Sequence, residues 1–251
     1  MTLRDEPQRL IPGLVGLSAH TDCVYLKALH SFTVRDAHGK GVSRLKLLYS
    51  SLNFEELVEN TRTGRWDAAE QQIADAAAAL KAGGADFLLI CANTAYALLG
   101  RTREQVRLPV LDIAEPVCHA LKSAGLRAPG LLSTVKTEES GLYQRCAEKF
   151  GLKVISPSFE LAQSIQQLIL EELISGEVSE LGVQLIRSAI GWFADHGADS
   201  LILGCTDLTH VVSHLEQGGD TDLPLFDSTR LHAAAAAEFA LSGEAKTVYT
   251  L

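Results

Sequence analysis

The sequence predicts an α/β fold of two similar lobes, each a parallel β-sheet covered by helices, related to each other by a pseudo-two-fold duplication. Three observations support this prediction: short apolar runs alternate with amphipathic stretches, one motif occurs twice, and its flanking segments recur in the same order. Parallel strands are buried on both faces, so they are typically short and apolar throughout. A chain in which such strands alternate with helices is typical of a parallel α/β architecture.

The repeat is clearest where residues 84–94 align without gaps on residues 197–207. The first copy reads Gly-Ala-Asp-Phe-Leu-Leu-Ile-Cys-Ala-Asn-Thr and the second reads Gly-Ala-Asp-Ser-Leu-Ile-Leu-Gly-Cys-Thr-Asp. Two shorter pairs keep nearly the same offset: 12–15 with 129–132, and 108–112 with 223–227. Matches in the same order indicate two copies of one unit rather than a solenoid of many repeats.

Strands are expected at the short apolar runs, and helices at the longer stretches whose apolar residues recur at helical spacing. The predicted strands are 14–17, 87–91, 110–113, 130–133, 153–156, 201–204 and 225–226. The predicted helices are 66–81, 161–173, 179–197 and 228–241. The second helix is expected to stop at Gly176, because glycine commonly caps a helix C-terminus. The last helix is expected to pack back on the first lobe.

The duplication also sets the predicted domain boundaries. Residues 1–115 together with 226–251 are expected to form the N-terminal α/β lobe, and residues 116–225 the C-terminal α/β lobe. Ligands of parallel α/β sheets bind beyond the carboxyl ends of the strands. Two lobes that face each other would therefore present the strand ends near 92–94 and 205–206 to one interlobe active-site cleft.

Composition argues against several classes of protein. The chain has 251 residues, of which 47% are hydrophobic, so it can bury a substantial core. Its net charge of −9 argues against nucleic-acid or anionic-membrane binding, because clustered Lys and Arg supply that affinity. Residues 1–10 lack the apolar core of a signal peptide, and no apolar run approaches the roughly 20 residues that span a bilayer. We therefore expect a cytoplasmic protein with no nucleic-acid or membrane partner.

One cysteine stands out as a candidate for catalysis. The chain has five cysteines, at positions 23, 91, 118, 146 and 205. Their odd number and wide spacing argue against a disulfide framework or a zinc site. An average free cysteine is buried and inert, but Cys205 lies at a strand end within the repeat and precedes Thr206 and Asp207, which favours a catalytic thiol. Backbone N–H groups at the start of a following helix would lower the pKa of this thiol and favour the thiolate.

Polar side chains near the predicted strand ends are candidates for binding a substrate carboxylate. The candidates are Ser18, Asn93, Thr94, Ser133, Thr134, Thr137, Thr206 and His210. Hydroxyl and amide groups can donate hydrogen bonds to a carboxylate, and a helix N-terminus is itself an anion site. The hydroxyl and amide side chains could instead only cap the helices that follow, and a lone histidine is more often structural, so both interpretations stay open.

The sequence carries none of the common cofactor or hydrolase motifs. It has no GxGxxG, P-loop, GxSxG or HExxH pattern. Its lysines do not stand in a recognisable pyridoxal-binding context. Nothing in the sequence therefore requires a cofactor.

Four segments together carry a recognisable family pattern. They are Gly84 through Ala95, Leu132-Ser133-Thr134, Leu203 through Leu208, and Asp227-Ser228-Thr229 to His232-Ala233. In this combination they resemble the aspartate/glutamate racemase superfamily. The resemblance extends over nearly the whole chain, and Trp66–Ala69 and the 163–176 helix resemble its aspartate racemase branch.

The resemblance implies an amino-acid racemase, an isomerase, that acts on aspartate-like or glutamate-like substrates without pyridoxal phosphate or metal, as a homodimer. It further implies two thiols on opposite faces of the substrate α-carbon, one to remove the proton and one to return a proton. Inversion requires an acid and a base on opposite sides of that carbon. Cys205 matches the second thiol. The first should stand immediately before Asn93, where this sequence has Ala92, and alanine cannot carry a proton.

Ala92 leaves three explanations open. It could be an engineered replacement of a catalytic Cys or Thr. The enzyme could instead be one-sided, with the other proton supplied by water or by a neighbour: His210, His20, Tyr96 or Thr94. Third, the protein could be a single-Cys decarboxylase or isomerase, because arylmalonate decarboxylases of the superfamily resemble this arrangement, or a non-catalytic relative that binds a small molecule. Tyr96 and His210 also depart from the aspartate-branch pattern, which leaves the substrate side chain open.

Overall fold

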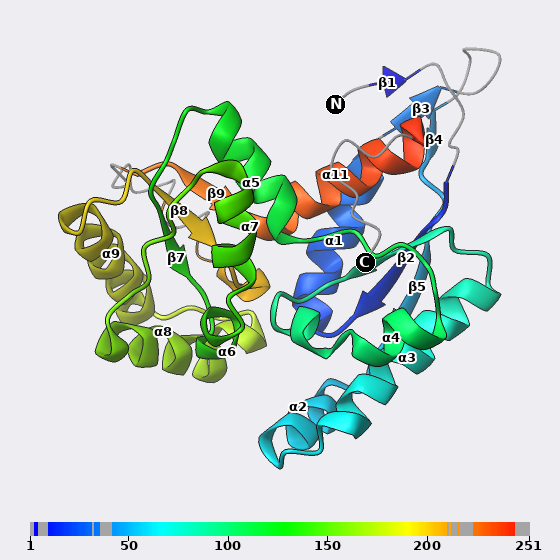
Figure 1. Ribbon diagram of the computed structural model, residues 1–251, viewed down its shortest axis with the longest axis horizontal. Helices are drawn as coiled ribbons and strands as arrows, with labels where there is room; N and C mark the ends of the chain where they lie inside the picture. Colours follow the sequence, from blue (N-terminus) through cyan, green and yellow to red (C-terminus); the bar gives the residue numbers. More distant parts are fainter. Residues whose placement is uncertain are drawn as a thin grey trace. The chain divides into compact units, whose positions relative to one another are not determined.

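The computed structural model describes residues 3–4, 10–31, 33–35, 42–209, 211, 215 and 223–243. The chain divides into two compact units, one comprising Met1–Asp112 and His232–Leu251 and the other Ile113–Leu231 (Figure 1). Each unit contains a three-stranded parallel sheet with helices packed on it. The predicted α/β fold of two similar parallel-sheet lobes is therefore confirmed.

The first unit is built on a parallel sheet with the strand order β5-β2-β6. The strands are β5 (Leu48–Ser51), β2 (Pro12–Gly16) and β6 (Phe87–Ile90). The helices are α1 (Ala19–Ser31), α2 (Phe54–Arg62), α3 (Trp66–Ala82), the 3₁₀ helix η1 (Thr94–Leu98), α4 (Gly100–Gln105) and the greater part of α11 (Ser228–Ser242). A separate small sheet joins β1 (Leu3–Arg4), β3 (Thr33–Arg35) and β4 (Val42–Arg44).

Helices cover both faces of the β5-β2-β6 sheet. On one face, Leu14 and Leu89 pack against α1 and α11. Helix α11 can approach closely because small residues line its buried side, namely the alanines at 233, 236, 237 and 240. Helix α3 packs against β2 and β5 through Ile73, Ala77 and Leu80, which recur at helical spacing. The predicted return of the last helix to the first lobe is confirmed.

The second unit is built on a parallel sheet with the strand order β7-β8-β9. The strands are β7 (Pro129–Leu132), β8 (Ser200–Leu203) and β9 (Leu225–Asp227). The helices are α5 (Ala114–Ser123), α6 (Val135–Glu139), α7 (Leu142–Phe150), α8 (Phe159–Glu171) and α9 (Glu180–Asp195), with 3₁₀ helices η2 (Leu173–Ser175) and η3 (Thr206–Leu208).

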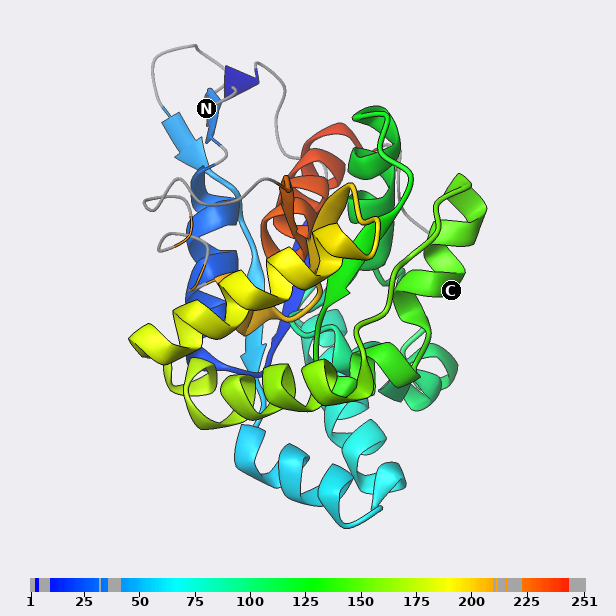
Figure 2. The same ribbon diagram turned by 90° about the vertical axis from the view of Figure 1, so that its left-hand side faces the viewer.

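The strands of the second unit are buried on both faces, as parallel strands require. Leu132 and Leu203 pack against α8 and α9, whereas Leu131 and Ile202 pack against α5 and α7. Figure 1 shows these two helix pairs on opposite sides of β7 and β8, and Figure 2 shows α9, in yellow, in front of the strands. Successive residues of a strand point to opposite faces, so a short run of apolar residues fills both layers.

The duplicated motif produces the same strand register in both units. Strand β2 pairs with β6 starting at Pro12 opposite Phe87, and β7 pairs with β8 starting at Pro129 opposite Ser200. These two pairs are equivalent in the sequence repeat. The match of register shows that the repeat encodes a repeated structure.

The repeated Gly-Ala-Asp triplet explains how this register is held. The Asp86 carboxylate accepts a hydrogen bond from the Ile11 N–H at 2.7 Å, and the Asp199 carboxylate accepts from the N–H groups of Arg127 at 2.6 Å and Ala128 at 3.0 Å. Burial by itself would raise the pKa of Asp199, but these donors outweigh it and lower that pKa. Each aspartate therefore ties the start of its own strand to the start of the neighbouring one.

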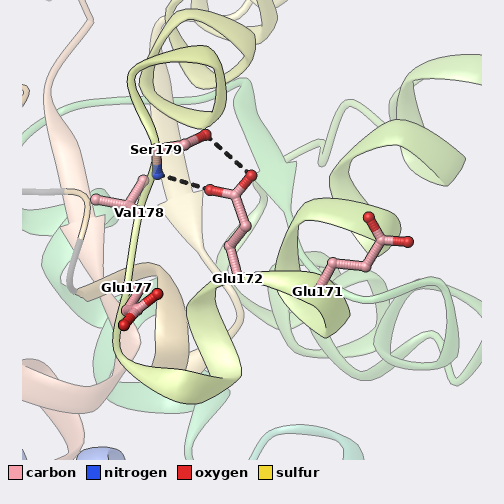
Figure 3. A pocket seen from close by; sticks show the side chains of 5 residues that line it. All are labelled: Glu171, Glu172, Glu177, Val178 and Ser179. Atoms are coloured by element: carbon pink, nitrogen blue, oxygen red, sulfur yellow. Dashed lines mark hydrogen bonds between the residues drawn. The ribbon is translucent and has the colours of Figure 1, made fainter.

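The connection from α8 to α9 is formed by capping interactions. Gly176 ends η2 with a φ of 81°, a left-handed conformation that favours glycine, as predicted from the sequence. Ser179 then caps α9 by accepting a hydrogen bond from the Gly182 N–H at 3.0 Å. The Glu172 carboxylate accepts from both the N–H and the hydroxyl of Ser179 (Figure 3).

Two strand predictions need correction, and one strand was missed. Residues 110–113 and 153–156 are not full strands: each makes a single bridge, Val110 with Leu88 and Ile155 with Gly130. Conversely, β5 was not expected, because its residues alternate between half-buried and exposed and do not form an apolar run.

Among the helices that the structure describes, none is long and apolar enough to cross a membrane.

Gly130 provides a test of the close packing in the second unit. A Cβ atom at this position would lie 2.5 Å from Phe193 Cδ1 and 2.7 Å from Leu201 Cδ2. Gly130→Ala should therefore lower the free energy of unfolding by about 1–3 kcal/mol. Gly191→Ala is the matched control, because a Cβ there meets no atom within 4 Å on an exposed side of α9, and it should raise stability by up to about 1 kcal/mol. Urea unfolding followed by tryptophan fluorescence measures both, and equal stabilities of the two variants would contradict this packing.

Candidate active site

The three strands of the second unit bring their carboxyl ends to one edge of the sheet. Leu132 of β7 lies opposite Leu203 of β8, and Leu203 lies opposite Asp227 of β9. The residues that follow are Ser133 and Thr134 after β7, Cys205 and Thr206 after β8, and Ser228 and Thr229 after β9. The predicted site residues of this unit that follow strands therefore share one edge.

Cys205 lies at the end of β8, two residues beyond its last strand position. Gly204 precedes it, and a Cβ atom there would lie 2.7 Å from Leu131 Cδ1 and 3.2 Å from Ser133 Cβ. The glycine therefore allows the strand end to pass close to β7. The Cys205 side chain is 7% exposed, and its Sγ lies 3.9 Å from Asp207 Oδ2, within reach of a weak S–H donor.

The surroundings of Cys205 favour the protonated thiol. Burial raises the pKa of Cys205, and the negative charge of Asp207 raises it further. The N–H groups of Asp207 and Leu208 act in the opposite direction, as predicted for a helix start, but they do not offset burial. The expectation that these donors would favour the thiolate in the free protein was therefore wrong.

Asp227 is a buried carboxylate at the same edge that the list of candidates omitted. It is 9% exposed, and its Oδ1 accepts hydrogen bonds from the N–H of Thr229 at 2.9 Å and from the Thr209 hydroxyl at 3.3 Å. Burial raises the pKa of Asp227, against the lowering effect of these donors and of Arg230. The repeat held a signal for it, because residues 108–112 and 223–227 both end in aspartate.

The residues that follow β7 lie at the predicted carboxyl edge of the sheet, and one of them also caps helix α6. The Thr134 hydroxyl accepts from the Thr137 N–H at 3.2 Å and lies 3.0 Å from the Thr137 hydroxyl, so it caps α6. The Ser133 hydroxyl donates to the Thr134 carbonyl at 3.1 Å. Thr137 is fully buried and Thr206 is 5% exposed. The capping interpretation therefore holds for Thr134.

In the first unit, Ala92, Asn93 and Thr94 follow β6. Asn93 is 4% exposed, and its side chain makes no cap hydrogen bond to η1. Ala92 and Thr94 are half-buried. Ser18 follows β2, is half-buried, and accepts the Asp22 N–H through its carbonyl at 2.8 Å. His210 lies outside the described residues.

The carboxyl edge of the first unit also holds a pair that was not predicted, Asp22 and Tyr49. Asp22 belongs to the first turn of α1 and is 2% exposed, and it accepts hydrogen bonds from the Leu17 N–H at 3.2 Å and the Tyr49 hydroxyl at 2.8 Å. Burial raises the pKa of Tyr49, and Asp22 raises it further. No motif marks this pair, because its members lie on different elements far apart in the sequence.

Two further candidate proton donors of the first unit, Tyr96 and His20, have different surroundings. The Tyr96 hydroxyl donates to the Leu111 carbonyl at 2.6 Å and lies 3.5 Å from His232 Nε2. His232 is fully buried, and burial lowers its pKa to about 3. Tyr96 therefore directs its hydroxyl into the core, whereas His20 is exposed at the start of α1.

Cys91, the residue before Ala92, is enclosed in the core of the first unit. It is 1% exposed and packs among Leu14, Leu89 and Leu111 in the core. Burial raises the pKa of Cys91 well above the ordinary value, and the charge of Asp22 adds to this effect. In the parts of the chain that the structure describes, no group of three or more His, Cys, Asp or Glu side chains is placed to hold a metal ion.

The second unit also has a surface pocket, which is lined by none of the residues at these strand ends. It is lined by Glu171, Glu172, Glu177, Val178 and Ser179 (Figure 3). None of these belongs to the predicted site. The Glu172 carboxylate accepts hydrogen bonds from Ser179, so the pocket is part of the connection between α8 and α9.

Known proteins share this sequence pattern and this fold. A family model described as Asp/Glu/hydantoin racemase matches residues 25–236. The chain is 33% identical over 129 residues to the glutamate racemase of Aquifex pyrophilus, covering 51% of this chain and 48% of that one. It is 26% identical over 163 residues to the broad-specificity amino-acid racemase RacX of Bacillus subtilis, covering 65% and 68%. The match thus spans about half the length of the curated glutamate racemase.

Solved structures give the same assignment over a longer stretch. A candidate Asp/Glu racemase from Yersinia pestis is 32% identical with a TM-score of 0.80, covering 93% of this chain and 100% of that one. An aspartate racemase homologue from Pyrococcus horikoshii is 25% identical with a TM-score of 0.73, covering 92% and 99%. The family model, the shared fold and the strand-end residues agree. The chain belongs to the Asp/Glu/hydantoin racemase family.

Proposed function

We propose that the protein is an amino-acid racemase of the aspartate/glutamate type that moves the α-proton through Cys205, without pyridoxal phosphate or metal. The observation that carries the proposal is the position of Cys205, at the carboxyl end of β8 beside the polar ends of β7 and β9. Ligands of parallel sheets bind at this edge. The relatives named above include racemases of glutamate and of several amino acids.

The proposed chemistry starts from a buried thiol. A substrate brings a positive α-ammonium group, which favours the Cys205 thiolate by offsetting the charge of Asp207. The thiolate then removes the α-proton, or the thiol returns one when the reaction runs in the other direction. Asn93, Thr94, Thr134 and Thr206 are proposed to bind the substrate carboxylates and to stabilise the enediolate-like charge that develops. Further candidate contacts are Ser18, Ser133, Thr137 and His210.

Ala92 favours a second candidate, a decarboxylase or isomerase that uses a single cysteine. Such an enzyme needs Cys205 only to protonate a planar intermediate after a malonate-like acid has lost carbon dioxide. Release of carbon dioxide from a malonate-like acid, with no α-proton exchange of amino acids, would support this candidate. Binding of an amino acid with no reaction would support a non-catalytic relative.

The first prediction concerns α-proton exchange. In D₂O the protein should replace the α-proton of L-aspartate or L-glutamate with deuterium and form the D-enantiomer, measured by NMR and chiral chromatography. Cys205→Ser should lower both rates about 10²- to 10⁴-fold, the usual contribution of general acid–base catalysis. Cys23→Ser, at an exposed thiol, should keep the wild-type rates. EDTA and hydroxylamine, which remove metals and trap pyridoxal phosphate, should change neither rate. Normal exchange by Cys205→Ser would remove this residue from the mechanism.

The second prediction concerns position 92. Ala92→Cys places a thiol where the family carries its first proton carrier, and it should raise the rate of racemisation by about 10²-fold or more. The same chiral assay measures it, with Ala92→Ser as the control of similar size. An unchanged rate would indicate that the proton on that side comes from another group.

The third prediction concerns the protonation of Cys205. Because burial and Asp207 raise its pKa, iodoacetamide should alkylate Cys205 slowly at neutral pH and faster as the pH rises. Asp207→Asn keeps the shape of the side chain and removes its charge, so the pH profile of alkylation should move to lower pH. Peptide mass spectrometry measures the rate, with exposed Cys23 as the internal reference. A profile that moves to higher pH would contradict the assigned role of Asp207.

We also propose, from the family resemblance, that the protein acts in the cytoplasm as a homodimer on a small amino acid or dicarboxylate. Light scattering of the purified protein would measure its oligomeric state.

A further inference from the structure

We propose that Asp227 and Thr229 bind the α-ammonium group of the substrate and thereby select free amino acids over ring-closed derivatives such as hydantoins, in which this nitrogen is an uncharged amide. This inference rests on the proposed racemase function, because it assigns the binding of one substrate group in that reaction. All of the residues concerned belong to the second unit.

Asp227 lies beside the segment that carries Cys205. In the strand register it is opposite Leu203, two residues before the thiol. The Ser228 hydroxyl donates a hydrogen bond to the Leu203 carbonyl at 2.7 Å. On the other side of the thiol, the Thr209 hydroxyl donates to Asp227 Oδ1 at 3.3 Å. The start of α11 is therefore bonded to the chain both before and after Cys205.

The Asp227 carboxylate uses only one of its two oxygens for hydrogen bonds within the chain. Its Oδ1 caps α11 by accepting from the N–H groups of Thr229 at 2.9 Å and Arg230 at 3.2 Å. Among the described residues, the buried Oδ2 finds no hydrogen-bond donor, and the hydroxyl of the fully buried Thr229 has no partner either. Buried polar groups are nearly always hydrogen-bonded, so two such atoms in one helix turn indicate a partner from outside the chain.

A cationic donor fits these two atoms best. A carboxylate oxygen only accepts hydrogen bonds, so the partner of Oδ2 must donate. Burial raises the pKa of Asp227 in spite of the donors around Oδ1, so a positive charge beside Oδ2 would stabilise the carboxylate more than a water molecule would. An ammonium group brings this charge together with three N–H donors, one of which can reach the Thr229 hydroxyl.

Arg230 is the charged neighbour that such a ligand would replace. Its Nε lies 3.5 Å from Asp227 Oδ2, but no hydrogen bond joins the two atoms. The Arg230 side chain is 55% exposed, and an ion pair to an exposed side chain contributes little to stability. Turning the guanidinium outward would therefore cost little and would open Oδ2 to a stronger donor.

Binding the ammonium group at this place would also serve the proposed chemistry. The group is attached to the α-carbon itself, so holding it beside residues 203–209 holds the α-carbon near Cys205. Its positive charge is the one that favours the Cys205 thiolate over the thiol. A hydantoin has neither the charge nor the three donors, so it would leave the Asp227 carboxylate uncompensated.

Two ligands that differ only in the ammonium group test the assignment by isothermal titration calorimetry. α-Methylaspartate and 2-methylsuccinate share both carboxylates and the methyl group, and α-methylaspartate has no α-proton to lose. If the protein racemises glutamate faster than aspartate, α-methylglutamate and 2-methylglutarate replace them. The wild-type protein should bind the ligand with the ammonium group about 10-fold or more tightly than its match, because a hydrogen bond between charged groups is lost in the match.

Asp227→Asn should remove this preference. Asparagine keeps an oxygen that can cap α11 and accept from Thr209, but it lacks the charge. We expect about 10-fold or more loss of affinity for the ammonium ligand and an unchanged affinity for its match. Asp199→Asn is the control: this carboxylate accepts backbone N–H groups at the other end of the same sheet, so the variant should keep the wild-type preference.

Thr229→Val tests the second member of the subsite. The substitution keeps the shape of the side chain and removes a hydroxyl that has no partner in the described structure, so the thermal midpoint should stay the same or rise. The affinity for the ammonium ligand should nevertheless fall several-fold. Thr102→Val removes another buried hydroxyl without a partner among the described residues, in α4 of the first unit, and it should leave the affinity unchanged.

The outcomes separate this subsite from the racemase function. Equal affinity of the wild-type protein for the two ligands, or no binding of either, would overturn the subsite. An equal loss of affinity for both ligands in Asp227→Asn would do the same, because a purely structural role affects both. The racemase function would stand in each case if the wild-type protein inverts amino acids in D₂O. Absence of exchange and inversion would overturn the racemase function, whereas a preference that depends on Asp227 would still support ammonium binding.

Discussion

The burial of the parallel strands on both faces is the constraint on which the rest of the structure depends. A strand covered by helices on each side can place polar groups only where it ends, because an unpaired polar group inside either layer would be destabilising. The register set by Asp86 and Asp199 makes neighbouring strands end together. Short polar residues at those ends, such as Cys205 and Asn93, are therefore collected at the carboxyl edge of their sheet.

The same burial sets the protonation of polar groups at these edges. Each pKa unit above the ordinary value adds about 1.4 kcal/mol to the free energy of deprotonation at a given pH. Cys205 and Tyr49 are both held in the protonated form by burial and by a nearby carboxylate. A thiolate that forms against this bias is a strong base toward a carbon acid. The carboxylates Asp207 and Asp22 thus stand in comparable relations to the Cys205 thiol and the Tyr49 phenol, although they belong to different local structures.

The fold was largely predictable because its signals are local and repeated. The duplication identified β6 and β8, and Gly176 and Ser179 marked a helix end and a helix start that the structure confirms. Strand β5 was missed because its mixed pattern reflects a strand at the end of the β5-β2-β6 order, where packing decides burial. Asp22 and Tyr49 could not be predicted either, since their contact depends on how α1 packs on β2 and β5.

The two copies of the repeat preserve the edge of the sheet and differ in the chemistry placed there. Cys205 and Ala92 occupy equivalent positions, as do Asp207 and Thr94. In the first unit, glycine at position 16 opens the end of β2 to a phenol from β5 and a carboxylate from α1. Parallel strands of one sheet end at the same edge, so the side chains that gather there can come from any strand or adjoining helix of that unit.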